Sequence, residues 1–252
     1  MAIDSYIICT NPRSGSTLLC DLLSASGVAG QPDSYFRPQS RDDWRAEFAL
    51  PLLEHQSPVL FDAAFIDGAI ACGRQDGAIF GLRLMYDSLA PLRDALQARY
   101  PAATGDTALL NAAFGQIHYI HLTRQDKLAQ AVSHARAEQT GLWHRHADGR
   151  ERERLAPPQS PHYDHSLIDH YLQLMSRHDE AWHSWFAAED IKPFTLTYEA
   201  LAADPAASLG ELLAALGLDP APAKLVRPQT RRLADATSAE WIAKYTAETG
   251  RR

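Results

Sequence analysis

Short apolar runs alternate along the chain with longer stretches whose apolar residues recur every third or fourth position. The runs are long enough for buried strands, and the longer stretches have the period of amphipathic helices. The expected strands are residues 6–9, 78–85, 116–123 and 193–197. Strands that alternate with helices form a parallel sheet that is covered on both faces. We therefore predict an α/β fold of three layers around a central, mostly parallel sheet.

The helical stretches lie between and after these strands. They begin near residue 18 and continue at 42–54, 61–73, 87–99, 107–114, 125–140, 163–189, 205–216 and from about 238. The segment 141–162 is charged and contains Pro157-Pro158, so we expect a long surface loop or a mobile lid there. The length of 252 residues suits one α/β domain, and we treat residues 1–252 as a single domain.

The first strand ends in a turn of small residues. Pro12 cannot donate a hydrogen bond to a sheet, so the strand stops there. A helical pattern follows, and the first amides of a helix lack partners and favour a negative charge. The residues of this turn are Arg13, Ser14, Gly15, Ser16 and Thr17, with Leu18 next in the helical pattern. A simple N-capped helix would need only one Ser or Thr, so we predict an anion-binding loop, the cradle loop (residues 13–18).

The cradle loop differs from the nucleotide-binding P-loop, which has Gly, four residues, and then Gly-Lys followed by Ser or Thr. With Gly15 aligned to the second Gly, Ser16 stands in place of the Lys and Thr10 in place of the first Gly. A loop without that Lys is poorly equipped to stabilise charge between β- and γ-phosphates. The pattern therefore favours a donor with a 5′-phosphate other than ATP.

Two arginines near strand ends add to this prediction. A cation such as Arg83 inside a strand is expensive unless it is paired. Either Arg83 reaches a ligand at the strand end or the strand lies at an edge, and we favour the ligand. Arg124 follows the third strand, at the end where open α/β sheets bind ligands. Ser133 lies nine residues further on in a predicted helix, so Arg124 and Ser133 could hold one phosphate from two sides.

Composition narrows the function classes. A net charge of −7 and a pI near 5.8 argue against a general nucleic-acid binder. No stretch reaches the apolar length of a membrane span, and the acidic start Met1-Ala2-Ile3-Asp4 does not resemble a signal peptide. Three cysteines without metal-ligand spacing are typical of buried thiols in a reducing compartment, so we expect a cytoplasmic protein.

A metal site is the alternative that the histidines raise. His144, His146, His162 and His165 come from one region of the chain. None has a carboxylate or Cys at a recognised metal-ligand interval. We therefore expect no metal ion in the site.

These motifs, in this order, resemble those of sulfotransferases that use 3′-phosphoadenosine 5′-phosphosulfate. The resemblance covers nearly the whole chain, most closely to the bacterial branch that contains trehalose 2-sulfotransferase and lipopolysaccharide sulfotransferases. Residues 13–19 are similar to the 5′-phosphosulfate loop of the family, and Arg124 with residues 130–133 to its 3′-phosphate motif. Residues 198–201 resemble the segment near the adenine, and residues 224–252 the C-terminal nucleotide-binding stretch.

The resemblance implies a set of residues that bind the donor nucleotide. They are Arg13, Ser14, Gly15, Ser16, Thr17, Leu18, Arg124, Gln130, Ser133, Tyr198, Gln229, Arg231 and Arg232.

This chain differs from the family at the position of the proposed general base. The family places a Glu, proposed as that base, immediately before two aromatic residues, whereas this chain has Ser34 before Tyr35-Phe36. Asp33, one residue earlier, is our candidate base, with His162, His165 and His170 in reserve. The catalytic set is Asp33, Arg13 and Ser34, and the set that lines the acceptor pocket is Tyr35, Phe36, Arg37, Trp44 and Arg83.

The activity implied is in-line, metal-independent transfer of a sulfuryl group to a hydroxyl of a carbohydrate or glycolipid. Trehalose, a lipopolysaccharide sugar and a small alcohol remain open as acceptors, and a homodimer remains open as the assembly. The alternatives are a P-loop-type kinase of a small metabolite, for which the acid Asp87 follows the second strand, and a nucleotide-binding module without catalysis.

Overall fold

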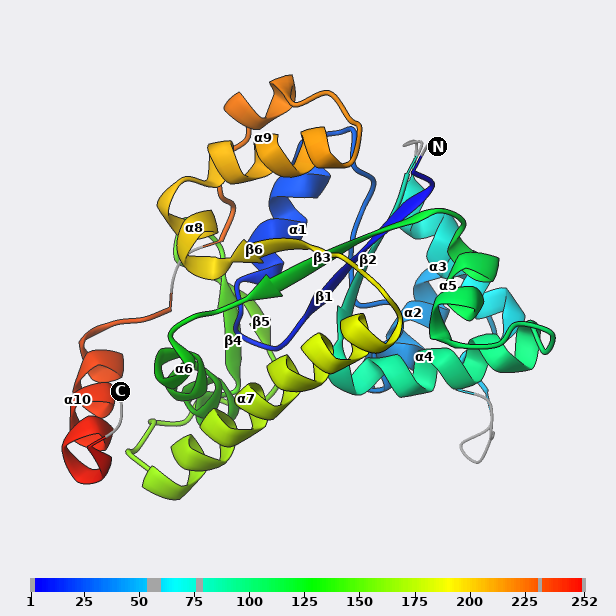
Figure 1. Ribbon diagram of the computed structural model, residues 1–252. Coiled ribbons are helices and arrows are strands. Elements are labelled where there is room, and N and C mark those ends of the chain that lie inside the picture. Colours follow the sequence, from blue (N-terminus) through cyan, green and yellow to red (C-terminus); the bar gives the residue numbers. More distant parts are fainter. Residues whose placement is uncertain (1–2, 54–59, 76–78, 231–232, 251–252) are drawn as a thin grey trace.

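Four parallel strands form the centre of the molecule in the computed structural model, which describes residues 3–53, 60–75, 79–230 and 233–250 (Figure 1). They are β1 (Ser5–Thr10), β2 (Phe80–Met85), β3 (Ile117–Thr123) and β6 (Phe194–Thr197). Their order across the sheet is β2-β1-β3-β6, and all three pairings are parallel. The predicted parallel sheet is confirmed, with β1 and β3 inside and β2 at one edge.

Helices cover both faces of this sheet (Figure 1). Their bounds are α1 (Ser16–Ala25), α2 (Arg41–Glu47), α3 (Ala63–Arg74), α4 (Tyr86–Arg99), α5 (Asp106–Phe114), α6 (Lys127–Thr140), α7 (His165–Ala188), α8 (Tyr198–Ala203), α9 (Pro205–Ala215) and α10 (Ala236–Thr249), with short 3-10 turns η1 (Pro38–Ser40) and η2 (Ala221–Lys224). A second sheet consists of β4 (Leu142–Arg145) and β5 (Glu151–Arg154).

Alternation along β1 divides the core into two layers. Ile7 and Cys9 pack with α3, α4, α5 and α7 on one face, whereas Tyr6 and Ile8 pack with α1, α8 and α9 on the other. Every residue of β1 is buried, as a strand covered on both faces requires. The three-layer prediction is confirmed, and the sheet holds the loops at its carboxyl edge in fixed relative positions.

A third apolar cluster joins the end of the chain to the middle. Trp241 and Tyr245 of α10 pack against Val132 of α6 and Ile168 of α7. Figure 1 shows α10 beside α6, on the side of the sheet where β1 and β3 end. The C-terminal helix therefore buttresses the helix that carries Ser133.

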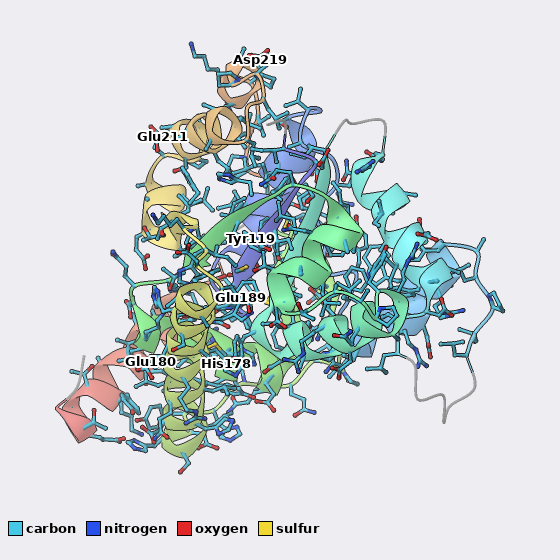
Figure 2. All side chains as sticks on the ribbon, turned by 45° about the vertical axis from the view of Figure 1, so that its right-hand side comes forward. Tyr119, His178, Glu180, Glu189, Glu211 and Asp219 are labelled. Carbon is cyan, nitrogen blue, oxygen red and sulfur yellow. The ribbon has the colours of Figure 1, made fainter. Side chains whose placement is uncertain are left out.

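α7 crosses the molecule and joins several elements. Its C-cap residue Glu189 accepts hydrogen bonds from the Thr107 amide (2.9 Å) and the Thr107 hydroxyl (2.7 Å) at the start of α5. Figure 2 labels Glu189 together with His178 and Glu180, which lie further back along α7. No helix in the described part of the chain is both long enough and apolar enough to cross a bilayer.

Two predicted segments differ from the structure. The helix expected at 42–54 ends at Glu47, because Pro51 cannot continue a helix and Ala49 has a left-handed backbone with φ +55°. The loop expected at 141–162 contains the antiparallel hairpin β4–β5, so that prediction was wrong for both strands. Residues 155–162 have no regular structure, as expected.

Candidate active site

The cradle loop connects β1 to α1 through residues with a left-handed backbone. The φ angle is +62° at Arg13 and +84° at Gly15. Gly15 precedes α1 and offers no side chain to the first amides of that helix. Six other described helices begin at side chains that accept a helix amide: Asp62, Asp126, Asp164, Thr197, Asp204 and Asp235. The start of α1 therefore has the form of an anion site.

Two predicted donor-binding residues are turned toward the protein and shape the loop. The hydroxyls of Ser14 and Thr10 lie 2.6 Å apart, and both residues are buried. The Gln130 amide of α6 donates to the Pro12 carbonyl over 2.7 Å. These bonds hold the cradle loop to the end of β1 and to α6.

Arg13 links the cradle loop to α6 and to the hairpin. Its Nε donates to the Ser133 hydroxyl over 3.0 Å, and its Nη1 donates to the Trp143 carbonyl over 2.6 Å. Ser133, which was predicted to bind a different phosphate, therefore lies in direct contact with the cradle loop.

Arg124 approaches the same loop from the end of β3. Its Nη1 donates to the Arg13 carbonyl over 3.3 Å, and its guanidinium carbon lies 4.7 Å from the centre of the Tyr198 ring. Tyr198 in turn packs against Gly15. Burial, and then the charge of Arg124, lowers the pKa of Arg13 to about 10. Two guanidiniums this close favour an anionic ligand between or beside them.

Gly15 gives a direct test of how closely the loop and Tyr198 fit. A Cβ at this position would lie 2.5 Å from Tyr198 Cδ2, at a φ of +84° that side chains rarely adopt. Such strain costs about 1–3 kcal/mol, and we expect Gly15→Ala to weaken binding of adenosine 3′,5′-bisphosphate by about tenfold. Calorimetric titration measures the change.

A matched control for this prediction is Gly217→Ala. Gly217 also has a positive φ, +71°, but nothing lies within 4 Å of the added carbon. This variant should lose stability and keep its affinity for the bisphosphate. Equal loss of affinity in the two variants would show that the contact with Tyr198 is unimportant.

One carboxylate on α7 holds the ends of both central strands. Asp179 accepts from the Asn11 amide (2.5 Å) at the end of β1 and from the Thr123 hydroxyl (2.5 Å) at the end of β3. Lys127 forms an ion pair with the same carboxylate and donates to the Arg124 carbonyl over 2.5 Å. Asp179 could not be predicted, because it lies on a helix more than 50 residues along the chain from either strand end that it contacts.

A cavity of about 820 Å³ opens beside the cradle loop. Thr17 and Asp21 of α1 form one wall, Arg83 of β2 a second, and the hairpin β4–β5 a third. Six residues predicted for catalysis or acceptor binding line it: Asp33, Ser34, Tyr35, Arg37, Trp44 and Arg83. The structure therefore brings most of the predicted acceptor residues to one cavity.

Three side chains hold Arg83 in place on the cavity wall. It forms an ion pair with Asp33 (2.8 Å) and donates to the hydroxyls of Ser34 (2.8 Å) and Thr17 (3.1 Å). β2 is an edge strand of its sheet, as one of the two accounts of Arg83 expects, and Arg83 also lines the cavity, so its contact with a ligand stays a prediction. Asp33 and Ser34 thus reach the cavity as partners of Arg83.

The two aromatic residues after Ser34, Tyr35 and Phe36, have different surroundings. Phe36 is 1 % exposed and packs edge-on against Phe61, with ring centres 5.3 Å apart, so it belongs to the core and not to the cavity wall. Tyr35 is also 1 % exposed, and its hydroxyl donates to the Gln31 carbonyl. The expectation that Phe36 faces an acceptor is corrected, because this ring fills the space between the sheet and α3.

Sequence reasoning missed the hairpin residues that face the cavity. His144, Arg152 and Glu153 line it, and Arg152 forms two hydrogen bonds with Asp21 of α1, at 2.5 and 2.9 Å. The only signal for Arg152 and Glu153 was their place in a charged segment after α6, and the sequence raised His144 only as a metal-ligand candidate.

The reserve histidines lie away from the cavity wall. His165 faces Glu248 at 2.8 Å, the ring of His170 packs against Tyr171, and the His162 amide donates to Gln139. Within the described residues, no three His, Cys, Asp or Glu side chains gather as metal ligands.

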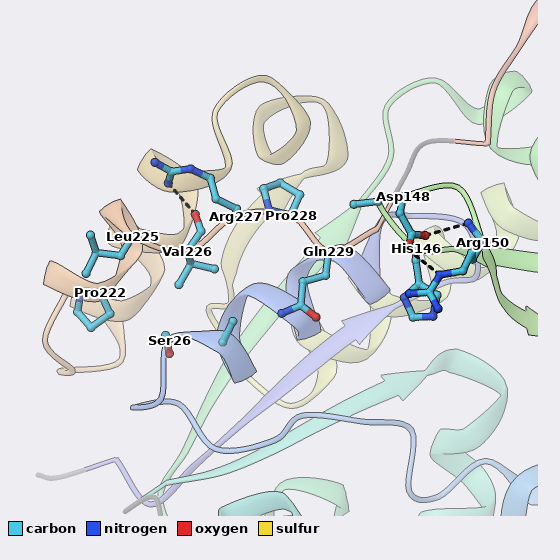
Figure 3. A pocket seen from close by; sticks show the side chains of 12 residues that line it. Ser26, His146, Asp148, Arg150, Pro222, Leu225, Val226, Arg227, Pro228 and Gln229 are labelled. Carbon is cyan, nitrogen blue, oxygen red and sulfur yellow. Dashed lines mark hydrogen bonds and ion pairs between the residues drawn. The ribbon is translucent and has the colours of Figure 1, made fainter.

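Gln229 lies on the wall between the cavity and a second hollow of about 700 Å³ (Figure 3). Its carbonyl accepts from the Ala147 amide at the tip of the hairpin, and Ser26, past the end of α1, lines the same hollow. The structure thus places Gln229 near the end of α1 opposite the cradle loop. Arg231 and Arg232 lie outside the described residues.

The family model described as Stf0 sulphotransferase matches residues 5–248. The chain belongs to the Stf0 sulphotransferase family. The resemblance drawn from the sequence motifs is therefore confirmed.

Two relatives of this Stf0 sulphotransferase are named trehalose 2-sulfotransferase. The one from Mycobacterium tuberculosis is 31% identical over 271 residues, which cover 99% of this chain and 97% of the relative. The one from Mycolicibacterium smegmatis is 29% identical over 266 residues, covering 98% and 96%.

Two solved structures are similar over nearly the full length of the Stf0 chain. The sulfotransferase domain of the Synechococcus PCC 7002 olefin synthase has a TM-score of 0.43 and 17% identity, covering 97% of this chain and 95% of that domain. A sulfotransferase from Alicyclobacillus acidocaldarius has a TM-score of 0.40 and 15% identity, covering 100% and 97%.

Proposed function

We propose that this Stf0 sulphotransferase transfers the sulfuryl group of 3′-phosphoadenosine 5′-phosphosulfate to a hydroxyl of a carbohydrate or glycolipid. The observation that carries the proposal is the 3.0 Å contact between Arg13 and Ser133. It brings a loop suited to the 5′ end of the donor beside the Arg124–Ser133 pair, which is suited to its 3′-phosphate.

The residues around the cradle loop fit such a donor. The amides at the start of α1 and the side chain of Thr17 would hold the 5′-phosphosulfate, and Arg124 with Ser133 would hold the 3′-phosphate. Tyr198, which packs against both Gly15 and Arg124, would lie beside the adenosine. Helix N-termini and arginines are the groups that proteins use for phosphates.

Arg13 has a role that the sequence motif did not express. Two of its donors are engaged by Ser133 and the Trp143 carbonyl. We infer that it positions the two phosphate-binding regions against each other and adds positive charge where negative charge develops on the leaving 5′-phosphate oxygen. The α1 amides share that charge.

The cavity supports a carbohydrate as the acceptor. Its volume of about 820 Å³ lies in the usual range for small-molecule sites. The Trp44 ring offers an apolar face to a sugar, and Arg37, Asp21 and Arg152 offer hydrogen-bonding groups to its hydroxyls. The trehalose 2-sulfotransferases among the relatives support a disaccharide of this kind.

Asp33 is a candidate to receive the acceptor proton, because it faces the cavity and is 46 % exposed. Its ion pair with Arg83 makes it equally suited to orient the acceptor by accepting a hydrogen bond. A sulfuryl group carries one negative charge, so we propose transfer without a metal ion.

Equilibrium binding and a transfer assay test the proposal. We expect adenosine 3′,5′-bisphosphate to bind at least about 100-fold more tightly than ATP with Mg²⁺, because the loop lacks the Lys for β- and γ-phosphates and has a second phosphate site. Sulfate transfer to a panel of trehalose, glucose and lipopolysaccharide should persist in the presence of a chelator. Preference for ATP with Mg²⁺ would favour the kinase, and bisphosphate binding without transfer to any member of the panel would favour the non-catalytic module.

A further inference from the structure

The side of the cavity nearest the cradle loop is closed by a histidine of the hairpin. His144 Nε2 lies 3.2 Å from the Thr17 hydroxyl, in the first turn of α1, and 3.5 Å from a Glu153 carboxylate oxygen. His144, Thr17 and Glu153 all line the cavity. An imidazole here faces both the phosphate-binding end of α1 and the space proposed for the acceptor.

The other polar groups at this end are already engaged by a cation. Arg83 donates to Asp33 Oδ1 and to Ser34 Oγ, both over 2.8 Å. The same Asp33 oxygen accepts from the Ser34 amide over 2.6 Å. Asp33 Oδ1 and the Ser34 hydroxyl are thus already held by hydrogen bonds from neighbouring donors, whereas the His144 ring faces the cavity.

The Thr17 hydroxyl lies between Arg83 and the imidazole of His144. Arg83 Nη1 can only donate, so the Thr17 oxygen accepts from it over 3.1 Å. The Thr17 oxygen has a second lone pair as well as its hydrogen, so its contact with His144 Nε2 is compatible with either tautomer of the ring. In the tautomer with the proton on Nδ1, Nε2 carries the lone pair that can receive a proton.

Charges on every surrounding element act on this imidazole. Burial, and then the positive charges of Arg13, Arg83 and Arg152, lowers the pKa of His144 to about 3. The negative side chains facing the same space are Glu153 of the hairpin, Asp21 of α1 and Asp33 of the loop before β2. An imidazole surrounded by three arginines is neutral but weakly basic. An anion bound among these arginines would offset their charge and raise the basicity of the ring.

We infer that His144 is the general base that receives the proton of the acceptor hydroxyl, and that it becomes effective only when the anionic donor is bound. The inference rests on the proposed function. The acceptor O–H proton passes to His144 Nε2, and the freed electron pair forms the new bond to sulfur. The bond between sulfur and the 5′-phosphate oxygen breaks, and its electron pair leaves with the phosphate. Glu153 faces the imidazolium that forms, and the proton then passes to water.

His144→Gln tests the base directly. We expect kcat to fall by about 100- to 1,000-fold, within the range for loss of a general base. The dissociation constant of adenosine 3′,5′-bisphosphate should change by less than about threefold. The acidic limb of the pH profile of kcat should disappear with the imidazole. A kcat within about threefold of wild type would overturn the assignment.

His146→Gln is the matched control, because His146 is at the tip of the same hairpin and lines the second hollow. It should keep wild-type kcat. Asp33→Asn separates the two candidate bases, and an orienting Asp33 predicts a higher KM and a smaller loss in kcat than His144→Gln. The reverse order of kcat losses would return the role to Asp33.

Titration of the His144 ring by NMR tests the dependence on the donor. The apparent pKa should rise by at least about one unit when adenosine 3′,5′-bisphosphate is added, because its phosphates counter the arginine charges. An unchanged pKa with bound bisphosphate would overturn the dependence on the donor. If the wild-type chain failed to bind the bisphosphate or to sulfate any member of the acceptor panel, the proposed function itself would be overturned. Binding and transfer by the wild-type chain are therefore measured before the variants.

Discussion

Replacing Arg124 by alanine should weaken the binding of adenosine 3′,5′-bisphosphate by about 100-fold, because a buried guanidinium makes strong charge-assisted hydrogen bonds to phosphate. Arg124 lies at the carboxyl end of β3, 3.3 Å from the Arg13 carbonyl and stacked on Tyr198. The sheet and the Tyr198 ring fix its direction, so water cannot replace the lost contacts with the same geometry. Calorimetric titration of the two proteins measures the difference.

The loss of affinity in Arg124→Ala should be selective for nucleotides that carry a 3′-phosphate. Adenosine 5′-phosphosulfate lacks the 3′-phosphate, and its affinity should change by less than about threefold in Arg124→Ala. The control variant is Arg150→Ala, since Arg150 is an exposed arginine at the hairpin tip whose partner is Asp148. Equal losses for the two nucleotides would contradict the assignment of Arg124 to the 3′-phosphate.

Replacing Arg13 by alanine should lower kcat by about 100- to 1,000-fold, comparable to the loss of an oxyanion-hole donor. The variant loses the positive charge that we propose lies beside the leaving 5′-phosphate oxygen. It also loses the bonds to Ser133 (3.0 Å) and to the Trp143 carbonyl (2.6 Å), which hold α6 and the hairpin against the cradle loop. Steady-state kinetics with the donor varied at saturating acceptor measures the effect.

Arg13→Lys separates the two contributions of Arg13. A lysine keeps the charge but cannot form both bonds of the guanidinium, so an intermediate kcat is expected. Arg227→Ala is the control, because the Arg227 side chain donates to the nearby carbonyls of Lys224 and Val226 and lines the second hollow, not the cavity beside the cradle loop. An Arg13→Ala protein with wild-type kcat and an unchanged thermal melting curve would show that neither contribution matters.

The fold could be predicted because its signals are local. β1 is an apolar run that ends at a proline, and the Gly15 turn and α1 follow it directly. The Asp and Thr residues that cap six described helices lie next to the segments that they cap. Hydrophobic periodicity and helix capping depend on residues a few positions apart, so both can be recognised in a single sequence.

The walls of the cavity could not be predicted in the same way. The hairpin strand Glu151–Arg154 alternates acids and bases without an apolar face, so its pattern gives no strand signal. Its position comes from side-chain contacts across the chain, such as Arg152 with Asp21. The pairing of Arg83 with Asp33 joins positions 50 residues apart. Phe36 was assigned to the cavity because aromatic residues suit sugars, but core packing decides its position.

The junction at Asp179 has a consequence for how donor preference could change. Asn11 precedes the cradle loop and Thr123 precedes Arg124, and both donate to this one carboxylate. The gap between the two proposed phosphate-binding regions is therefore set by α7 and not by either region alone. A nucleotide with more widely separated phosphates could not be accommodated by altering one loop, since the other loop is tied to the same helix residue. Laboratory evolution toward such a donor should first select changes at position 179 or in the segment of α7 around it.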